Sequence, residues 1–384
     1  MAHKIPRRSV IYGTLLLFLL VVVFAADYCL DFDSVAKSSE THPNIPLAKN
    51  TSSRNTDSPD TTMMKESLRY IPHSTMQTWR ERDYLIVFGI PSVDIDSRRR
   101  RRDLQRTTCW QFPGVARRAN DFTGAMLVLY VLARHPSQGY NYSAALLEEA
   151  TLWHDVITLP MNEGRPNRKN LEYSSYSWGN EVQIGMSRKT FLWFELALRL
   201  FPRIMYITKG DDDIFMRVPQ FLSDLRLLPR KGIYWGVTIP LELQRGNTSV
   251  RYRIAAGWCY TLSRDVAEHF VSYEPLKRLV HLPYKKKRER GFLALSMDHE
   301  DVMVGRVLQV ESPYTPLILV ADVGCRFQDV YNSSVAAIVG PKAVVIHHLQ
   351  EDEYAVLMDR FGNGTTYRPK MRFLPKPNQI KFLC

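Results

Sequence analysis

Three consecutive carboxylates, Asp211, Asp212 and Asp213, are the most distinctive group of potentially reactive side chains in the sequence. Adjacent anions repel one another, so such a run is tolerated where a cation or strong hydrogen-bond donors compensate it. Hard divalent cations such as Mg²⁺ and Mn²⁺ prefer oxygen ligands and share them with substrate phosphates. The run therefore predicts a metal–diphosphate site, and the alternative interpretation is a solvated acidic turn.

The element that must position these carboxylates is an apolar run at residues 203–208, which ends in Lys209-Gly210. Its β-branched and aromatic residues predict a short buried strand. Nucleotides bind at the carboxyl ends of strands in α/β sheets. This position, with Phe215 just beyond the carboxylates, favours the metal site over the acidic turn.

A second acidic group lies at Asp298-His-Glu-Asp301. Asp298 is a suitable helix N-cap, which places Glu300 and Asp301 in the first turn, where the helix dipole stabilises ionised carboxylates. Ordinary acidity at a helix start is the alternative interpretation. Further on, a predicted strand at 343–349 carries His347 and His348. Adjacent strand residues face opposite sides, so we expect at most one of these histidines to point into the site.

The rest of the folded region alternates predicted strands and helices, which indicates an α/β sheet with right-handed crossovers. Strands are expected at 84–90, 125–132, 155–159, 232–238 and 257–263, and helices at 97–110, 142–150, 188–201, 221–228 and 265–271. Asp96 or Ser97 is expected to cap the first helix, and Ser187 the third. The first helix contains five arginines, residues 98–102, and its positive end suits an anion. The alternatives for this run are a solvated face or a processing signal.

The overall charge does not define the partner. The 384 residues carry a formal net charge of +12, concentrated in the basic runs 98–102 and 285–288. No nucleic-acid-binding motif accompanies either run, so we expect no nucleic-acid partner. Five cysteines without a CxxC pair argue against a zinc site and leave one or two disulfides open. Cys29 either joins a second subunit in a homodimer or remains a free or acylated thiol.

The N-terminus predicts the compartment. Basic residues precede an uncharged apolar run at 10–26, which is just long enough to span a bilayer. A cleaved signal peptide is the alternative, but the length favours an uncleaved anchor with residues 1–9 in the cytosol. The polar segment 27–79 predicts a disordered lumenal stem, and 80–384 the folded domain. Lumenal Asn-x-Ser/Thr sequons fit this type II topology: Asn50, Asn141, Asn247, Asn332 and Asn363.

Taken in order, the motifs of residues 84–348 resemble the β-1,3-galactosyltransferase and N-acetylglucosaminyltransferase superfamily, glycosyltransferase family 31, in particular its kinetoplastid branch. The matching elements are the strand and Arg-rich helix ending in Trp110, Glu149 with Asp155-Val156, Lys189-Thr190, Lys-x-Asp-Asp-Asp-x-Phe at 209–215, Gly-x-x-Tyr-x-x-Ser at 257–263 and Glu-Asp-Val-x-x-Gly at 300–305. Two departures are the poorly matched segment 162–180 and a shifted Arg106-Thr-Thr-Cys-Trp110.

The resemblance implies a GT-A fold, a Rossmann-like mixed sheet with flanking helices, and an inverting transfer of galactose or N-acetylglucosamine from a UDP-sugar donor to a hydroxyl of a glycan acceptor. It implies that Asp213 and one histidine, His347 in preference to His348, ligate Mn²⁺, with Mg²⁺ as the alternative, and that Asp301 is the general base. The expected substrate-binding residues are Lys209, Asp211, Asp212, Gly257, Glu300 and Arg106. The expected location is the Golgi membrane. A non-catalytic lumenal glycan-binding protein with the same fold is the alternative function.

Overall fold

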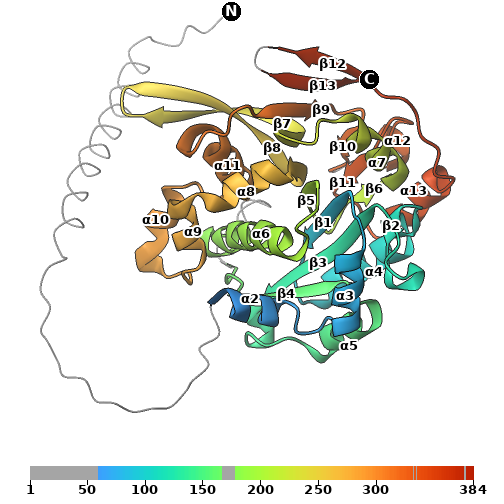
Figure 1. Ribbon diagram of the computed structural model, residues 1–384, viewed down its shortest axis with the longest axis horizontal. Helices are drawn as coiled ribbons and strands as arrows, with labels where there is room; N and C mark the ends of the chain where they lie inside the picture. Colours follow the sequence, from blue (N-terminus) through green and yellow to red (C-terminus); the bar gives the residue numbers. More distant parts are fainter. Residues whose placement is uncertain (1–58, 167–177, 332, 334, 376–377) are drawn as a thin grey trace, which may run out of the picture. The chain divides into compact units, whose positions relative to one another are not determined.

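The computed structural model describes residues 59–166, 178–331, 333, 335–375 and 378–384 (Figure 1). The predicted anchor at 10–26 and the first part of the predicted stem lie outside these residues. Within the described part of the chain, no helix is both long and apolar enough to cross a membrane.

A mixed sheet of ten strands forms the centre of the domain (Figure 1). Its strands are β1 Ile86–Pro91, β2 Val115–Ala116, β3 Met126–Arg134, β4 Val156–Asn162, β5 Tyr206–Gly210, β7 Ile233–Arg245, β8 Thr248–Ser263, β9 Ile318–Asp322, β12 Lys370–Leu374 and β13 Gln379–Leu383. A smaller sheet contains β10 Phe327–Asp329, β11 Val345–His347 and β6 Phe215–Met216. The predicted mixed α/β architecture is confirmed.

The order of the strands creates a switch point in the large sheet. From β1 the chain builds outward to β3 and β4, all parallel, and then returns to β5 on the other side of β1. The antiparallel strand β8 follows, and then β7, β9, β13 and β12. In open α/β sheets, ligands bind outside the carboxyl ends of the strands where the strand order reverses. Here that place is the β1–β5 pair.

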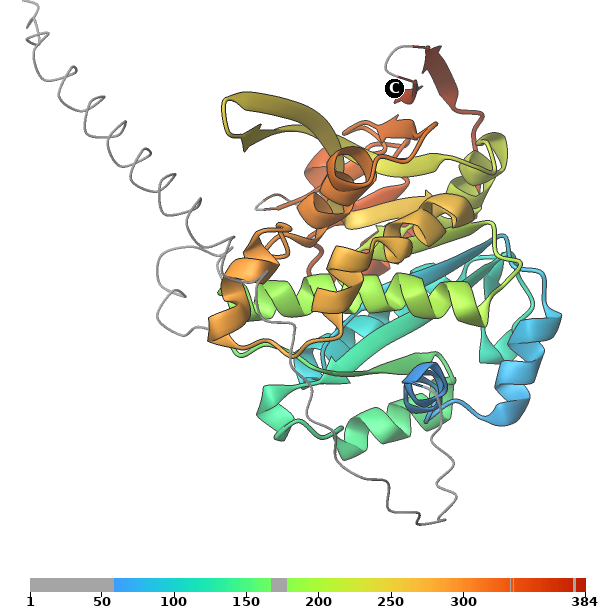
Figure 2. The same cartoon turned by 60° about the vertical axis from the view of Figure 1, so that its left-hand side comes forward.

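Helices cover both faces of the large sheet (Figures 1 and 2). Their bounds are α2 Pro59–Ser67, α3 His73–Glu81, α4 Asp96–Thr107, α5 Ala144–Trp153, α6 Asn180–Leu200, α7 Val218–Leu227, α8 Arg264–Ser272, α9 Glu274–Val280, α10 Glu289–Leu293, α11 Glu300–Arg306, α12 Val335–Ile338 and α13 Glu353–Phe361. Strand β1 shows why two cores form. Val87 belongs to the core under α6, whereas Phe88 belongs to the core on the opposite face.

Helix α6 lies directly on the sheet because β1 contains a glycine. A Cβ atom at Gly89 would lie 2.1 Å from the ring of Trp193, so any side chain there would push the helix away. The Trp193 indole N–H also donates to the carbonyl of Thr208 on β5, at 3.0 Å. These contacts fix α6 across the switch point.

The caps predicted for α6 and α4 are wrong. Helix α6 begins at Asn180, so Ser187 lies inside it, and its hydroxyl donates to the Met297 carbonyl at 2.6 Å. A buried serine with a tertiary acceptor does not need to cap a helix end. Helix α4 has Ile95 in extended conformation at its N-cap position, and Asp96 lies in the first helical turn.

The predicted extent of the disordered stem is also wrong. Helix α2 lies within the range 27–79, and α3 begins within it and runs to Glu81. Met63, Ile71 and Trp79 are buried in the core under α6. Apolar residues are few here and show weak periodicity, so composition alone indicated a disordered chain. The folded domain therefore begins at least as early as Pro59.

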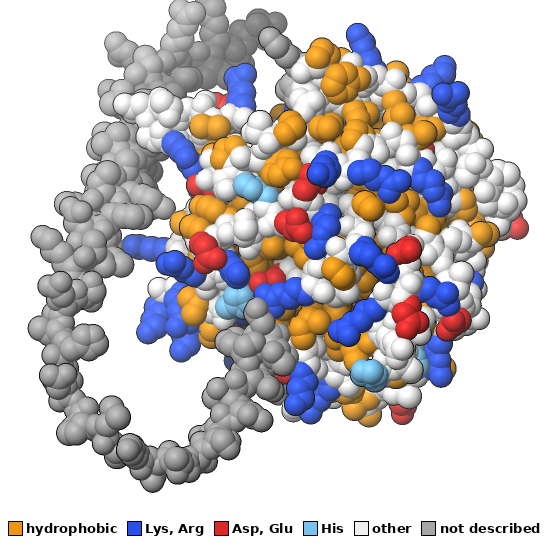
Figure 3. Space-filling view, in the orientation of Figure 1, with side chains coloured by type: hydrophobic (Ala, Val, Ile, Leu, Met, Phe, Trp, Pro, Cys, Tyr) orange, Lys and Arg blue, Asp and Glu red, His pale blue; other side chains and the backbone are white. Residues whose placement is uncertain are grey.

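The disulfide left open by the sequence joins Cys325 to the C-terminal Cys384. Cys109 and Cys259 are free and buried. Basic side chains are interspersed with acidic ones on the face shown in Figure 3. In the basic run 285–288, for example, Lys286 pairs with Glu289 at 2.7 Å.

Candidate active site

The three carboxylates lie in the loop after β5, at the predicted carboxyl end of a buried strand. Asp212 is the most buried of them and points back into the protein. Its Oδ2 accepts from the Ser92 hydroxyl at 2.7 Å, and its Oδ1 pairs with Arg98 at 2.5 Å. Because Ser92 follows β1, these bonds tie the two strands of the switch point together. Asp212 therefore shapes the loop, and its carboxylate is not free for the substrate.

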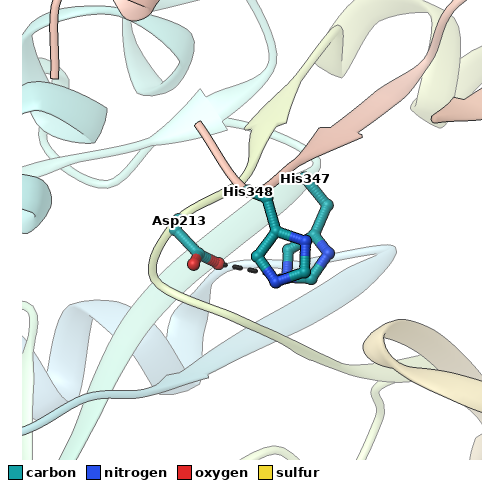
Figure 4. A group of neighbouring side chains, drawn as sticks. All are labelled: Asp213, His347 and His348. Carbon is teal, nitrogen blue, oxygen red and sulfur yellow. Dashed lines mark ion pairs between the residues drawn. The ribbon is translucent and has the colours of Figure 1, made fainter. Parts of the chain in front are cut away.

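Asp213 lies beside both His347, the last residue of β11, and His348, which follows it (Figure 4). The His347 Nε2 is 3.3 Å from Asp213 Oδ1. One ligand atom from each of Asp213, His347 and His348 falls within 4.8 Å of the others. The structure thus brings the two predicted metal ligands together and adds His348.

The prediction that only one histidine faces this region is wrong. Strand β11 ends at His347, and His348 has left the strand with a φ of 62°. Side-chain alternation holds only while the backbone stays extended. The left-handed residue turns the second ring to the same side, so the two ring centroids lie 3.8 Å apart.

Two further residues hold the imidazoles. The His348 Nδ1 lies 2.6 Å from one oxygen of Asp329, and the His347 Nδ1 lies 3.6 Å from the other. Trp258 stacks on the opposite side of His347, with ring centroids 5.2 Å apart and planes inclined by 3°. A carboxylate is the usual outer partner of a metal-binding imidazole. When it lies at Nδ1, it leaves Nε2 for the metal ion.

The donor set fits a divalent transition metal. Asp213 Oδ1 is buried and has no hydrogen-bond partner, an arrangement that is costly unless a cation is its partner. Burial opposes the charge of Asp213, but His347 and Arg101 outweigh burial and hold its pKa well below the usual range. Burial also opposes the protonated form of His347, yet Asp213 raises its pKa.

Lys209 connects this loop to the second acidic motif. Its buried Nζ lies 2.7 Å from Asp211 and 2.8 Å from Glu300, and it also donates to the Gly257 carbonyl. Burial opposes the charge of Lys209, but Asp211 and Glu300 raise its pKa well above the usual value. The lysine therefore carries a positive charge shared by the two carboxylates, and the two motifs form one site.

Glu300 and Asp301 lie in the first turn of α11, as predicted, with His299 rather than Asp298 at the N-cap position. Glu300 is buried, and the Tyr260 hydroxyl donates to it at 3.0 Å. Burial raises the pKa of Glu300 to about 7, although Lys209 opposes this. Asp301 is only half-buried. Its Oδ2 accepts from the Gly257 N–H at 3.0 Å and its Oδ1 from the Val302 N–H at 2.8 Å.

Gly257 is required by the close packing of β8 against α11. A Cβ atom at this position would lie 2.6 Å from the Glu300 carboxylate and 3.4 Å from that of Asp301. The absence of a side chain lets the backbone contact Lys209 through its carbonyl and Asp301 through its N–H. Gly257 was predicted to bind substrate; the contacts in the structure are with Lys209 and Asp301, which it holds together.

Arg106 does not join this cluster. Its guanidinium is buried and forms ion pairs with Asp155 at 2.8 Å and Glu149 at 2.7 Å, and it lies over the Tyr130 ring. These carboxylates occupy its donors, so Arg106 is not free to bind a nucleotide. The arginines that reach the acidic loop are Arg101 and Arg98, about one and two turns before Arg106 in the helix.

The residues that sequence reasoning missed share one property: they meet the site from distant parts of the chain. They are Ser92, Trp258 and Asp329, whereas Arg98 and Arg101 belong to the arginine run that the sequence had already indicated as a candidate anion site. The spacing of Arg98 and Arg101 was an available signal, because residues three apart share a helix face. Asp329 carried no such signal.

No family model matches the chain, and a search of curated proteins returns no relative. The resemblance to glycosyltransferase family 31 therefore rests on the motifs and remains a prediction.

Proposed function

We propose that this protein is a metal-dependent, inverting hexosyltransferase of the GT-A type, with UDP-galactose or UDP-N-acetylglucosamine as donor and a glycan hydroxyl as acceptor. The observation that carries the proposal is the pair of contacts made by Lys209, which joins the carboxylate loop at Asp211 to the first turn of α11 at Glu300. A candidate metal–diphosphate site and a half-exposed carboxylate, Asp301, thereby belong to one site.

The position of this site in the sheet supports a nucleotide donor. The carboxylate loop follows β5 and contacts Ser92 after β1, at the switch point of the large sheet. Helix α4 begins just beyond Ser92 and brings Arg98 and Arg101 to the loop. Two guanidiniums beside a candidate cation site suit a diphosphate, because they form charge-assisted hydrogen bonds with phosphate oxygens.

Asp213 and His347 would hold the metal ion, with His348 as an additional ligand. A mixed set of carboxylate and imidazole ligands favours Mn²⁺ over Mg²⁺, which prefers oxygen ligands alone. When bound, the ion would neutralise charge that develops on the diphosphate leaving group. Arg101, which pairs with Asp213 at 3.1 Å, would turn to the same phosphates.

Asp301 would act as the general base. Two backbone N–H groups fix its carboxylate, and its partial exposure leaves it accessible to an acceptor. It would take the proton from the acceptor hydroxyl as that oxygen bonds to the anomeric carbon and the bond from this carbon to UDP breaks. Attack opposite the leaving group converts an α-linked donor into a β-linked product. Buried Glu300 would position Lys209 instead.

A lumenal, type II protein of the Golgi membrane remains our proposal for its location. The Cys325–Cys384 disulfide supports an oxidising compartment, because disulfides persist there and are rare in the cytosol.

A donor assay with the full-length protein tests the proposal. We expect release of UDP from UDP-galactose or UDP-N-acetylglucosamine in the presence of Mn²⁺, its loss with EDTA, and less activity with Mg²⁺. Asp213→Ala should lower kcat/KM by at least about 100-fold, because a metal-bound leaving group supplies several kcal/mol. Asp96→Ala, which removes an exposed carboxylate of α4, is the control and should change little.

The same assay tests Asp301 and the alternative function. Asp301→Asn should abolish transfer while UDP still binds. Full transfer by either the Asp213 or the Asp301 variant would overturn the corresponding assignment. Glycan binding without UDP release from any donor would identify a non-catalytic glycan-binding protein.

A further inference from the structure

A second polar pocket lies at the carboxyl end of β4, away from the carboxylate loop. It has a volume of about 310 Å³ and lies between the end of β4, the first turns of α6 and the loop after α9. Tyr140, Glu163, Glu181, Arg188 and Tyr284 are among its lining residues. This volume is within the range of pockets that hold small molecules.

Arg188 is an unusual residue for the wall of a pocket. Arg188 is only 6% exposed. Its Nε donates to the Val280 carbonyl at 2.8 Å, and no carboxylate of the described residues pairs with it. Burial without a counter-ion lowers its pKa to about 10. Neighbouring Lys189, by contrast, is paired with Glu163 at 2.7 Å.

An uncompensated buried charge destabilises the fold that contains it. A well-packed apolar residue at position 188 would avoid that cost, so the backbone bond to Val280 is a weak reason for an arginine. A ligand with an anionic group would give a stronger reason for an arginine at this position, because it would pair with the guanidinium. The planar guanidinium forms two parallel hydrogen bonds with a carboxylate.

The charges of the pocket match a ligand with one negative charge. Lys189 neutralises Glu163, and Arg199 neutralises Glu195 beside His281, which leaves Arg134 and Arg188 against Glu181. One positive charge remains when His281 is neutral. A single carboxylate balances it, whereas a phosphate dianion exceeds it.

The remaining lining groups suit a sugar ring. The Tyr140 hydroxyl accepts from exposed Arg165 and the Tyr284 hydroxyl donates to Glu289, so these two residues contribute mainly ring surface. Asn162 and Glu163 offer planar polar groups for sugar hydroxyls. Tyr140 holds a φ of 63°, a left-handed conformation that costs a non-glycine residue about 1–2 kcal/mol. Residues in such strained conformations cluster at ligand sites. Gly164 keeps this end of β4 against α6, because its Cβ would lie 2.2 Å from the Glu181 backbone.

We propose that this pocket binds a monosaccharide that carries one carboxylate, such as a uronic acid, through the buried guanidinium of Arg188. The site does not require the metal centre or the proposed transfer reaction. It is connected to the carboxylate loop through Lys189, which donates to the Ser92 carbonyl at 2.7 Å, while the Ser92 hydroxyl bonds Asp212.

Thermal unfolding of the full-length protein in EDTA, without nucleotide, tests this proposal with D-glucuronate as the probe. We expect millimolar D-glucuronate to raise the Tm of the wild type by a few degrees, because a ligand that binds only the folded state stabilises it. D-glucose, the same ring without a carboxylate, and inorganic phosphate should give smaller shifts. Arg188→Met should remove the glucuronate shift, and Arg251→Gln, which removes an exposed cation on the β7–β8 hairpin, should retain it.

Measurements without ligand separate binding from a structural role. The Tm of Arg188→Met should equal or exceed that of the wild type, because the variant removes an unpaired buried charge. Glu181→Gln should strengthen glucuronate binding, since it removes the competing carboxylate. A glucuronate shift that persists in Arg188→Met, or equal shifts with glucose, would overturn the proposal. Because Asp213→Ala should retain the shift, failure of the metal site and failure of this pocket are distinguishable.

Discussion

Glu300 and Asp301 are neighbours in sequence, yet their surroundings give them different properties. Glu300 packs under β8 against Lys209 and Tyr260, whereas Asp301 is half-buried and is held by two backbone N–H groups. A general base must reach the acceptor proton. The accessible carboxylate therefore suits proton transfer, and the buried one suits the positioning of Lys209.

The raised pKa of Glu300 predicts a pH-dependent stability that Glu300→Gln removes. The pKa rises from 4.5 to about 7 on folding, so the folded protein holds this proton more tightly than the unfolded chain. The contribution of this proton to the unfolding free energy is complete below pH 4.5 and is lost as the pH rises through 7. Between pH 5 and 8 the variant should gain roughly 2–3 kcal/mol of unfolding free energy relative to the wild type.

Urea unfolding at several pH values measures this difference. Glu268→Gln on α8, which removes a half-exposed carboxylate, is the control and should show no comparable trend. If the free-energy difference between Glu300→Gln and the wild type were independent of pH, the carboxylate would have the same pKa in the folded and unfolded chains.

At the scale of elements, helix α4 presents two faces with different tasks. Arg98, Arg101 and Gln105 contact the loop after β5, whereas Arg102 and Arg106 contact Glu149 and Asp155. The helical period separates these two sets. The five-arginine run is therefore neither a uniformly solvated face nor a single anion site.

Substitutions on the two faces should affect different measurements. Arg101→Gln should raise the KM for the UDP-sugar about 10- to 100-fold, since a hydrogen bond to a charged group contributes roughly 1.5–3 kcal/mol. Arg106→Gln should instead lower the unfolding free energy by about 3–5 kcal/mol, because it leaves the Asp155 carboxylate without its partner, whereas Glu149 keeps Arg102. Arg100→Gln is the matched control, because its side chain is 59% exposed. Equal KM values for Arg101→Gln and Arg100→Gln would exclude Arg101 from donor binding.

The elements show what the sequence can predict. Apolar runs identified β1, β3, β4 and β5, because strands buried on both faces are continuously apolar. The carboxylates after β5 and in α11 were also found, because charge crowding is a local signal. The contacts of Asp329 with the histidines depend on the pairing of β10 with β11, which no local pattern encodes. The left-handed conformation of His348 was likewise not predicted, because the apolar pattern indicated a strand that continued to residue 349.

At the scale of the whole molecule, α2 and α3 extend the core in a way that composition concealed. Trp79 is 2% exposed and packs edge-on against Phe122 and at a tilt against Phe201, with ring centroids 5.8 and 6.1 Å apart. Helix α2 is held separately, since the Thr158 hydroxyl on β4 donates to the Glu66 carbonyl at 3.0 Å. Residues 59–81, the described part of the polar segment before β1, thus belong to the folded domain.

Removal of these contacts should destabilise the domain although they lie outside the proposed site. Trp79→Ala should lower the unfolding free energy by about 3–5 kcal/mol, the usual cost of emptying a buried aromatic position. Trp178→Ala is the control for the same chemical change, because Trp178 is 45% exposed. Chemical denaturation of both variants measures the difference.

The same reasoning predicts where the domain can be shortened. A fragment that starts at residue 57 retains α2 and α3 and should unfold at the same denaturant concentration as the full chain. A fragment that starts at residue 80, the domain boundary indicated by composition, loses Trp79 and exposes the apolar surface that it covers. It should unfold at a lower denaturant concentration and aggregate more readily. Equal midpoints for the two fragments would show that α2 and α3 contribute nothing to the stability of the core.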